Sequence, residues 1–201
     1  MFHQKIQHHI VLMLLICICV VFFCWPGQAV TIASGQGFDG SDIVDSFYTM
    51  KERLAVGVLF RTRAAEYHLA TVERDFLDSV VALALSQARR LPLNFSTTGT
   101  SISKLSISEK QTGVSQTPIA TKTNSTSIKT KITAFRSNAK GGLEVVCDSC
   151  PTDKQTWYTL SAATANFDLL VRKIAWAWKL QTAVVLEVSG LTIDNVFAQR
   201  E

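Results

Sequence analysis

The spacing of apolar residues predicts helices in the first half of the chain. Over residues 41–90, apolar side chains recur at intervals of three and four, as they do along one face of a helix. Ser41 is a suitable N-cap for a first helix, and Pro92 ends a second helix that is expected over 63–90. The run from Val56 to Phe60, between the two, fits either a helix or a strand.

From residue 128 onward the apolar spacing changes to two, which is the period of a strand. Residues 128–135 and 143–147 are predicted to form a hairpin around a turn at 138–142. Residues 157–160 are predicted to form a short third strand.

Helical spacing then resumes and predicts one amphipathic helix. Its apolar stripe consists of Ala163, Phe167, Leu170, Val171, Ile174 and Trp178. Residues 183–188 are expected to form a strand, and 191–197 either another strand or the start of a helix.

The segment between these two halves is rich in hydroxyl side chains. Between Ser96 and Thr133, 18 of 38 residues are Ser or Thr, and large apolar residues are sparse, so little of it is expected to be buried. The sequence therefore predicts an α+β fold class. Its parts are N-terminal helices over 30–92, a Ser/Thr-rich basic linker over 93–127, and a small α/β domain over 128–201 with a mostly antiparallel sheet and one amphipathic helix.

The first 29 residues have the layout of a secretory signal peptide. Lys5 and several histidines precede a sixteen-residue apolar run, Ile10 to Trp25, and small residues precede a cleavage site after Ala29. The run is short for a membrane-spanning helix, which needs roughly 20 residues. Cleavage is therefore expected, with an uncleaved membrane anchor as the alternative. Either outcome exports the remainder to the periplasm or the extracellular space.

Positive charge is concentrated in the middle of the chain. The net charge is +4, and residues 93–142 carry seven basic residues against the single acid Glu109. This stretch is interpreted as a solvated spacer, or as a cationic strip that contacts an acidic surface of lipid, glycan or protein. Nucleic acid is not expected as a partner, because the chain is exported and no aromatic residue lies between Phe95 and Phe135 to stack on bases.

The leader also changes what the cysteines can do. It contains three of the five, so the mature chain keeps Cys147 and Cys150. In an oxidising compartment these are expected to form a short-range disulfide. A thiol–disulfide activity is the alternative, although too few residues follow Cys150 to complete a thioredoxin fold. No metal site or cofactor is expected, because His68 is the only histidine of the mature chain.

The sequence carries no pattern that indicates catalysis. It has no Gly-x-Ser-x-Gly elbow and no phosphate-binding glycine motif, and a lone histidine such as His68 is most often a surface or core residue. We therefore expect a non-enzymatic protein that acts through contacts.

The predicted helix at 163–180 carries the strongest candidate contact surface. Away from its apolar stripe it presents Arg172, Lys173, Trp176 and Lys179. A partly exposed tryptophan ringed by cations suits a partner or glycan contact, because Trp and Arg contribute most to interface energetics. The alternative is that Trp176 packs under the N-terminal helices.

Residues 167–175 and 184–197 resemble the short N-terminal domain of secretins and its small stand-alone relatives in type IV secretion systems. The resemblance is carried by Phe-Asp-Leu-Leu-Val-Arg-Lys-Ile-Ala and by Val-Val-Leu-Glu-Val-Ser-Gly-Leu-Thr-Ile-Asp-Asn-Val-Phe. It implies a periplasmic component or assembly factor of an envelope-spanning secretion complex. Its partners would be other envelope proteins or further copies of the chain.

The same C-terminal elements also fit a second fold. Strand, strand, strand, helix, strand, strand over 128–197 is the order of an OB-like barrel, which resembles the receptor-binding subunits of secreted bacterial toxins and implies recognition of a glycan or receptor. The conformation of 191–197 separates the two: a strand that closes a barrel favours the OB-like protein, and a helix favours the envelope component.

Overall fold

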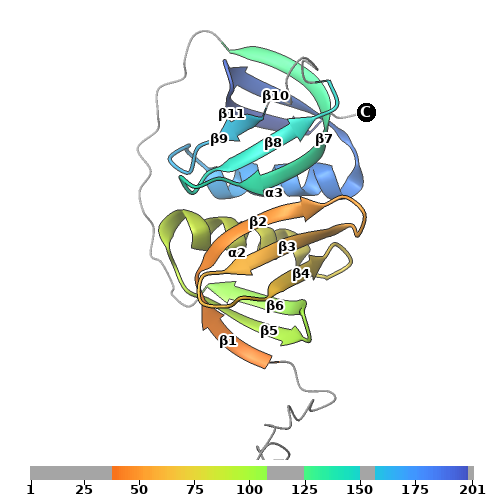
Figure 1. Ribbon diagram of the computed structural model, residues 1–201. Helices are drawn as coiled ribbons and strands as arrows, with labels where there is room; N and C mark the ends of the chain where they lie inside the picture. Colours follow the sequence, from red (N-terminus) through yellow and green to blue (C-terminus); the bar gives the residue numbers. More distant parts are fainter. Residues whose placement is uncertain (1–37, 108–124, 150–156, 199–201) are drawn as a thin grey trace, which may run out of the picture. The chain divides into compact units, whose positions relative to one another are not determined.

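The computed structural model describes residues 38–107, 125–149 and 157–198 (Figure 1). These residues form eleven strands and two helices. In the first part they are β1 (Phe38–Asp42), β2 (Val44–Met50), β3 (Ala55–Phe60), β4 (Glu66–Ala70), α2 (Phe76–Arg89), β5 (Leu93–Thr98) and β6 (Ser101–Ile107). In the second part they are β7 (Thr126–Ser137), β8 (Leu143–Cys147), β9 (Tyr158–Leu160), α3 (Phe167–Leu180), β10 (Ala183–Ser189) and β11 (Thr192–Ala198).

The C-terminal strands close into a barrel, because the long strand β7 pairs on two sides. Its first half pairs antiparallel with β10 and its second half pairs antiparallel with β8. The ring is completed by β8 with β9, β9 with β11 in parallel, and β11 with β10. A five-stranded ring with a helix between its third and fourth strands has the strand order of an OB-fold. We call it barrel 2.

The N-terminal strands repeat this arrangement. Their first strand bends at Ile43, so that β1 pairs with β5 while β2 pairs with β3. The ring continues through β4, which pairs antiparallel with β3 and in parallel with β6, and closes through β6 with β5. We call it barrel 1. The chain therefore contains two OB-like barrels in succession.

The two barrels are related by an internal repeat in the sequence. From the third strand to the fifth, equivalent residues lie ninety-one positions apart, and both fifth strands follow a glycine with positive φ, Gly99 and Gly190. Identical equivalent pairs are Tyr67/Tyr158, Leu69/Leu160, Phe76/Phe167, Val80/Val171, Ala84/Ala175, Gly99/Gly190 and Ile102/Ile193. Apart from the two glycines, all of these residues are buried. The repeat therefore preserves the barrel cores.

The expected α+β class is wrong, because the region predicted as helical, 30–92, contains four strands and only one helix among its described residues. A β-bulge explains part of the error. The register of β2 against β3 shifts between Val44 and Ser46, which brings Val44 and Phe47 to the same buried side three residues apart. This spacing imitates a helix. Val56–Phe60, which fitted either structure, lies in strand β3.

The predicted linker at 93–127 is also wrong in its first part. Residues 93–98 and 101–107 form β5 and β6, because Leu93, Phe95 and Ile102 are buried in the core and Leu105 and Ile107 pack partly against it. By contrast, the predicted hairpin around 138–142 and the amphipathic helix are confirmed as β7–β8 and α3. Of the undecided segment 191–197, residues 192–197 lie in strand β11.

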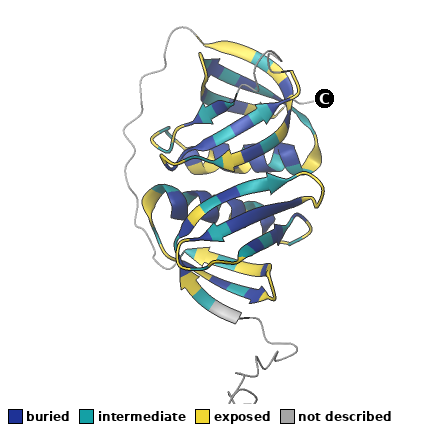
Figure 2. Cartoon of the chain, in the orientation of Figure 1, coloured by how far each residue is buried: buried dark blue, intermediate teal, exposed yellow. Residues whose placement is uncertain are grey.

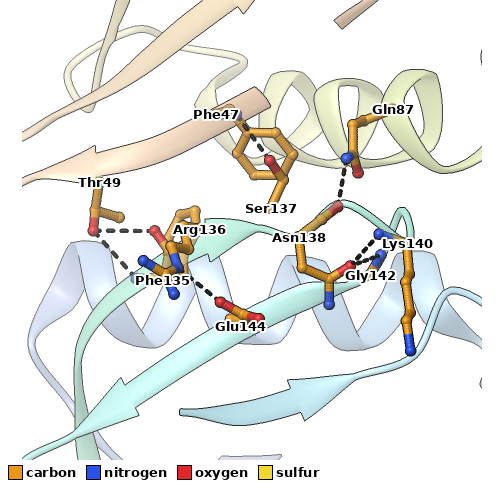
Figure 3. Close-up of polar contacts among 10 residues, drawn as sticks. All are labelled: Phe47, Thr49, Gln87, Phe135, Arg136, Ser137, Asn138, Lys140, Gly142 and Glu144. Carbon is orange, nitrogen blue, oxygen red and sulfur yellow. Dashed lines mark hydrogen bonds and ion pairs between the residues drawn. The ribbon is translucent and has the colours of Figure 1, made fainter. Parts of the chain in front are cut away.

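The two barrels meet along β2 and β7, where equivalent residues contact one another reciprocally (Figure 3). The Thr49 hydroxyl accepts a hydrogen bond from the Phe135 backbone N–H (3.1 Å) and donates to the Phe135 carbonyl (3.2 Å). In the opposite sense, the Ser137 hydroxyl accepts from the Phe47 N–H (3.0 Å). In the first strands equivalent residues lie eighty-eight positions apart, as the bulges at Val44/Ser46 and Ile132/Ala134 show. Thr49 is therefore equivalent to Ser137 and Phe47 to Phe135, so the junction has approximate two-fold symmetry, as in an isologous dimer.

Aromatic side chains fill the space between the helices and this junction. Trp178 of α3 lies edge-on to Phe135, with ring centroids 5.4 Å apart, and stacks near Phe76 of α2 at 6.2 Å. All three are at most 3% exposed. Trp178 therefore belongs to the cores of both barrels, which form part of one compact unit of the chain.

Several expectations concern residues outside the described ranges. The leader at 1–29, its alternative as an anchor, and its cleavage site all lie there. Within the described ranges, neither helix is long and apolar enough to span a bilayer.

The shared packing of Trp178 leads to a stability prediction. Trp178→Ala is expected to lower the free energy of unfolding by about 3–5 kcal/mol, because it opens a cavity between two cores. Chemical denaturation followed by circular dichroism measures the change, and both barrels should unfold in one transition. Leu180→Ala, on the same helix but half exposed, should change the free energy by no more than about 0.5 kcal/mol. A similar loss in both variants would contradict the shared core.

Candidate binding face

Six strands follow one another without interruption across the two barrels, in the order β4, β3, β2, β7, β8, β9. Outside the bulges in β2 and β7, side chains alternate along each strand between the barrel interior and the outer surface. Buried and partly exposed residues accordingly alternate along β8 (Figure 2). Near the β2–β7 junction, outward-pointing charged and aromatic residues include Tyr48, Glu66 and His68 of barrel 1 and Arg136, Glu144 and Trp157 of barrel 2. We call these six residues the joined face.

In barrel 1, a glycine allows residues of two non-adjacent strands to meet. Gly57 of β3 lies opposite Tyr48 of β2 and His68 of β4 in the register. A Cβ at Gly57 would lie only 3.0 Å from the Tyr48 ring and 3.0 Å from Glu66 Oε1. Because no side chain stands between them, the phenol and the carboxylate approach each other across β3.

This approach changes the acidity of the tyrosine. Burial raises the pKa of Tyr48 above its ordinary value of 10.0, and the negative charge of the nearby Glu66 raises the pKa further. His68 Nδ1 lies 3.6 Å from the same carboxylate, which is an ion-pair distance when the imidazole is protonated. Tyr48 therefore remains a neutral phenol and hydrogen-bond donor at physiological pH.

In barrel 2, the arginine at the position equivalent to Tyr48 is held on two sides. Arg136 Nε donates to Glu144 Oε2 at 2.7 Å, and the guanidinium carbon lies 4.0 Å from the centroid of the Trp157 ring (Figure 3 shows the ion pair). Arg136 is about half exposed and Glu144 about a quarter. A salt bridge and a cation–π contact together orient the arginine.

The two halves use the same geometry with different chemistry. Tyr48 and Arg136 pair directly across the junction and occupy equivalent positions. Tyr48 extends over β3 toward Glu66 of β4, and Arg136 extends over β8 toward Trp157, which precedes β9. Glu66 and Trp157 occupy equivalent positions. The joined face therefore presents a phenol and an acid on one side, and a guanidinium and an indole on the other.

A groove of about 400 Å³ runs along this junction. It is lined by two equivalent sets, Ser46–Thr49 and Ala134–Ser137, together with Trp157. It forms because β2 and β7 make only one ladder pair, Tyr48 with Arg136, and then separate. Its volume lies within the range typical of ligand sites, ~300–1,000 Å³.

The four residues predicted on α3 do not gather around one exposed tryptophan. Arg172 forms an ion pair with Asp78 of α2, and Lys179 Nζ lies 5.2 Å from the Phe76 ring centroid. Lys173 Nζ instead donates to the Val196 carbonyl at 2.8 Å, and Trp176 is partly buried against the core.

The other sequence expectations are addressed only in part. Cys147 is buried at the end of β8, but Cys150 lies outside the described residues, so their disulfide stays a prediction. The basic segment contributes Lys104, Lys129 and Lys131 as exposed residues of β6 and β7. Within the ranges that the structure describes, no cluster of His, Cys, Asp and Glu is arranged to hold a metal ion.

The joined face was not predicted from the sequence, although two signals were present. The alternation Glu66-Tyr67-His68-Leu69 marks a strand with two polar residues outward. The identical Tyr-x-Leu of the repeat then aligns Glu66 with Trp157. Only the pairing of β2 with β7 places these two halves on one surface.

Comparison with protein-family models, with curated proteins and with solved structures finds no match for this chain.

The contact between Tyr48 and Glu66 predicts a measurable change in titration. Glu66→Gln should lower the pKa of Tyr48, because the variant removes the negative charge that opposes phenolate formation, while burial keeps the pKa above 10.0. Tyrosine Cζ chemical shifts followed by NMR from pH 8 to 12 would report the change. Glu187→Gln, on β10 of barrel 2, serves as the control and should leave this titration unchanged. A Tyr48 pKa unaffected by Glu66→Gln would contradict the contact.

Proposed function

We propose that this protein is an exported, non-enzymatic module that binds oligosaccharides on the joined face. The observation that carries the proposal is the six-strand outer surface on which Tyr48, Arg136 and Trp157 surround one groove. OB-folds bind oligosaccharides and oligonucleotides on the outer side of their second and third strands. Here those strands of both barrels lie in one continuous sheet.

The residue types favour a sugar over other ligands. Sugar rings combine an apolar face, which packs on an aromatic ring such as that of Trp157, with hydroxyl groups that both donate and accept hydrogen bonds. Carboxylates accept from these hydroxyls, and the guanidinium and phenol donate to them. The joined face supplies acceptors in Glu66 and Glu144 and donors in Tyr48 and Arg136.

A nucleic acid is a weaker fit to the same surface. Among the six residues of the joined face only Arg136 is permanently positive, whereas a nucleic-acid site neutralises several phosphates. Oligonucleotides therefore serve as a comparison ligand in the test rather than as the proposed one.

The barrel also bears on the role in envelope assembly that was predicted from residues 167–197. The conformation of 191–197 was the criterion between the two hypotheses, and Thr192–Ala198 is a strand paired with β10 and β9. This favours the OB-like binding protein as the function to test first. The assembly role and the predicted export stay predictions.

The proposal is tested by comparing two tryptophans. Trp157→Ala is expected to weaken oligosaccharide binding at least about tenfold, since an aromatic contact at the centre of a site contributes about 2 kcal/mol or more. An array of neutral and acidic oligosaccharides identifies a ligand, and calorimetry with the best one measures its affinity.

Trp176→Ala is the matched control, because it removes the same side chain from α3, outside the joined face. Its affinity should remain within about twofold of the unmodified protein, with thermal melting used to confirm folding of both variants. Binding that is lost in Trp176→Ala but kept in Trp157→Ala would move the site to the surface predicted from the sequence. No binding to any oligosaccharide, or tighter binding to a single-stranded oligonucleotide, would reject the proposal.

A further inference from the structure

The guanidinium of Arg136 has one edge occupied and one edge available. Its Nε donates to Glu144 at 2.7 Å, and among the described residues no hydrogen bond to its two terminal nitrogens is found. The side chain is about half exposed and lines the groove at the junction. The four N–H donors on the terminal nitrogens therefore remain for a ligand.

The surroundings of Arg136 also hold that free edge in place. The guanidinium carbon lies over the Trp157 ring, 4.0 Å from its centroid, and Glu144 holds the Nε side. A guanidinium whose orientation is already restricted loses less entropy when it forms a two-point hydrogen bond. The two terminal nitrogens form a planar fork of donors, which we call the Arg136 fork. Its geometry matches the two oxygens of a carboxylate.

The charge of the ion pair does not prevent such a contact. Glu144 faces the Nε edge of Arg136, and the arginine balances its charge. A carboxylate of the ligand would bind the opposite edge, so that the guanidinium lies between two acids. On the other side of the junction, the neutral Tyr48 phenol adds a donor rather than a charge. Residues 93–142, which include Arg136, carry seven basic residues against one acid, and this excess favours the approach of an acidic ligand.

We propose that the Arg136 fork selects oligosaccharides that contain a carboxylate-bearing sugar, with the carboxylate held by the two terminal nitrogens. This inference rests on the proposed function and specifies its ligand class. Arg136 is then the residue that determines specificity, whereas Trp157 contributes affinity for neutral and acidic sugars alike.

The experiment uses pairs of ligands that differ only in charge. A sialyl oligosaccharide and an oligogalacturonate are each compared with their own methyl ester by calorimetry. The unmodified protein should bind at least one acid about tenfold more tightly than its ester, a difference of about 1.4 kcal/mol. Comparing the two ligand pairs shows whether the preferred carboxylate belongs to a sialic acid or to a uronic acid.

Variants of Arg136 then test whether its terminal nitrogens cause the preference for the acid over the ester. Arg136→Gln should reduce the acid-to-ester ratio to about one while ester binding persists. Arg136→Lys keeps the charge but loses the two-point geometry, and should give a smaller ratio than the unmodified protein. Lys140→Gln removes one exposed positive charge from the turn after β7 and should leave the ratio unchanged.

The outcomes distinguish this inference from the proposed function. Equal binding of acid and ester by the unmodified protein, or binding of neutral oligosaccharides alone, overturns the inference and leaves the proposed function standing. A ratio that survives both Arg136 variants places the selective contact elsewhere and also overturns it. Absence of binding to any oligosaccharide rejects both.

Discussion

The contact between β2 and β7 is the constraint on which the rest of the structure depends. Two closed barrels have no free strand edges, so their strands can pair with each other only where the long first strands leave the ring. Here the strands make a single ladder pair, Tyr48 with Arg136, and the hydroxyls of Thr49 and Ser137 satisfy the neighbouring backbone groups. This arrangement orients both barrels and creates the groove between them.

The internal repeat explains why the surface at this junction has two unlike halves. Buried positions such as Phe47 and Phe135 are constrained by core packing in each barrel, so they retain similar residues. The outward positions carry no such constraint, and Tyr48 and Arg136 differ although they are equivalent. A duplicated barrel thus presents a phenol and an acid beside a guanidinium and an indole.

The accuracy of the sequence predictions follows the regularity of each segment. The hairpin β7–β8 was predicted correctly although the register of β7 also shifts, between Ile132 and Ala134, because regular alternation runs from Ile128 to Ile132 and through all of β8. Helix α3 was predicted correctly because its apolar stripe is uninterrupted. In barrel 1 the bulge at Val44–Ser46 disrupts the alternation, and the sequence from Leu69 to Phe76 passes from a strand through a turn into α2 while keeping helical spacing. Periodicity alone does not distinguish this succession from one helix.

The sequence by itself determined which side chains are buried in β8 and α3, since the local period decides the face to which a residue points. It also contained the repeat, in residues such as Tyr67 and Tyr158. Only the tertiary structure decided which outward residues share a surface, because Tyr48 and Arg136 are brought together by pairing between strands far apart in the chain. The candidate site therefore depends on a long-range contact that has no local signature.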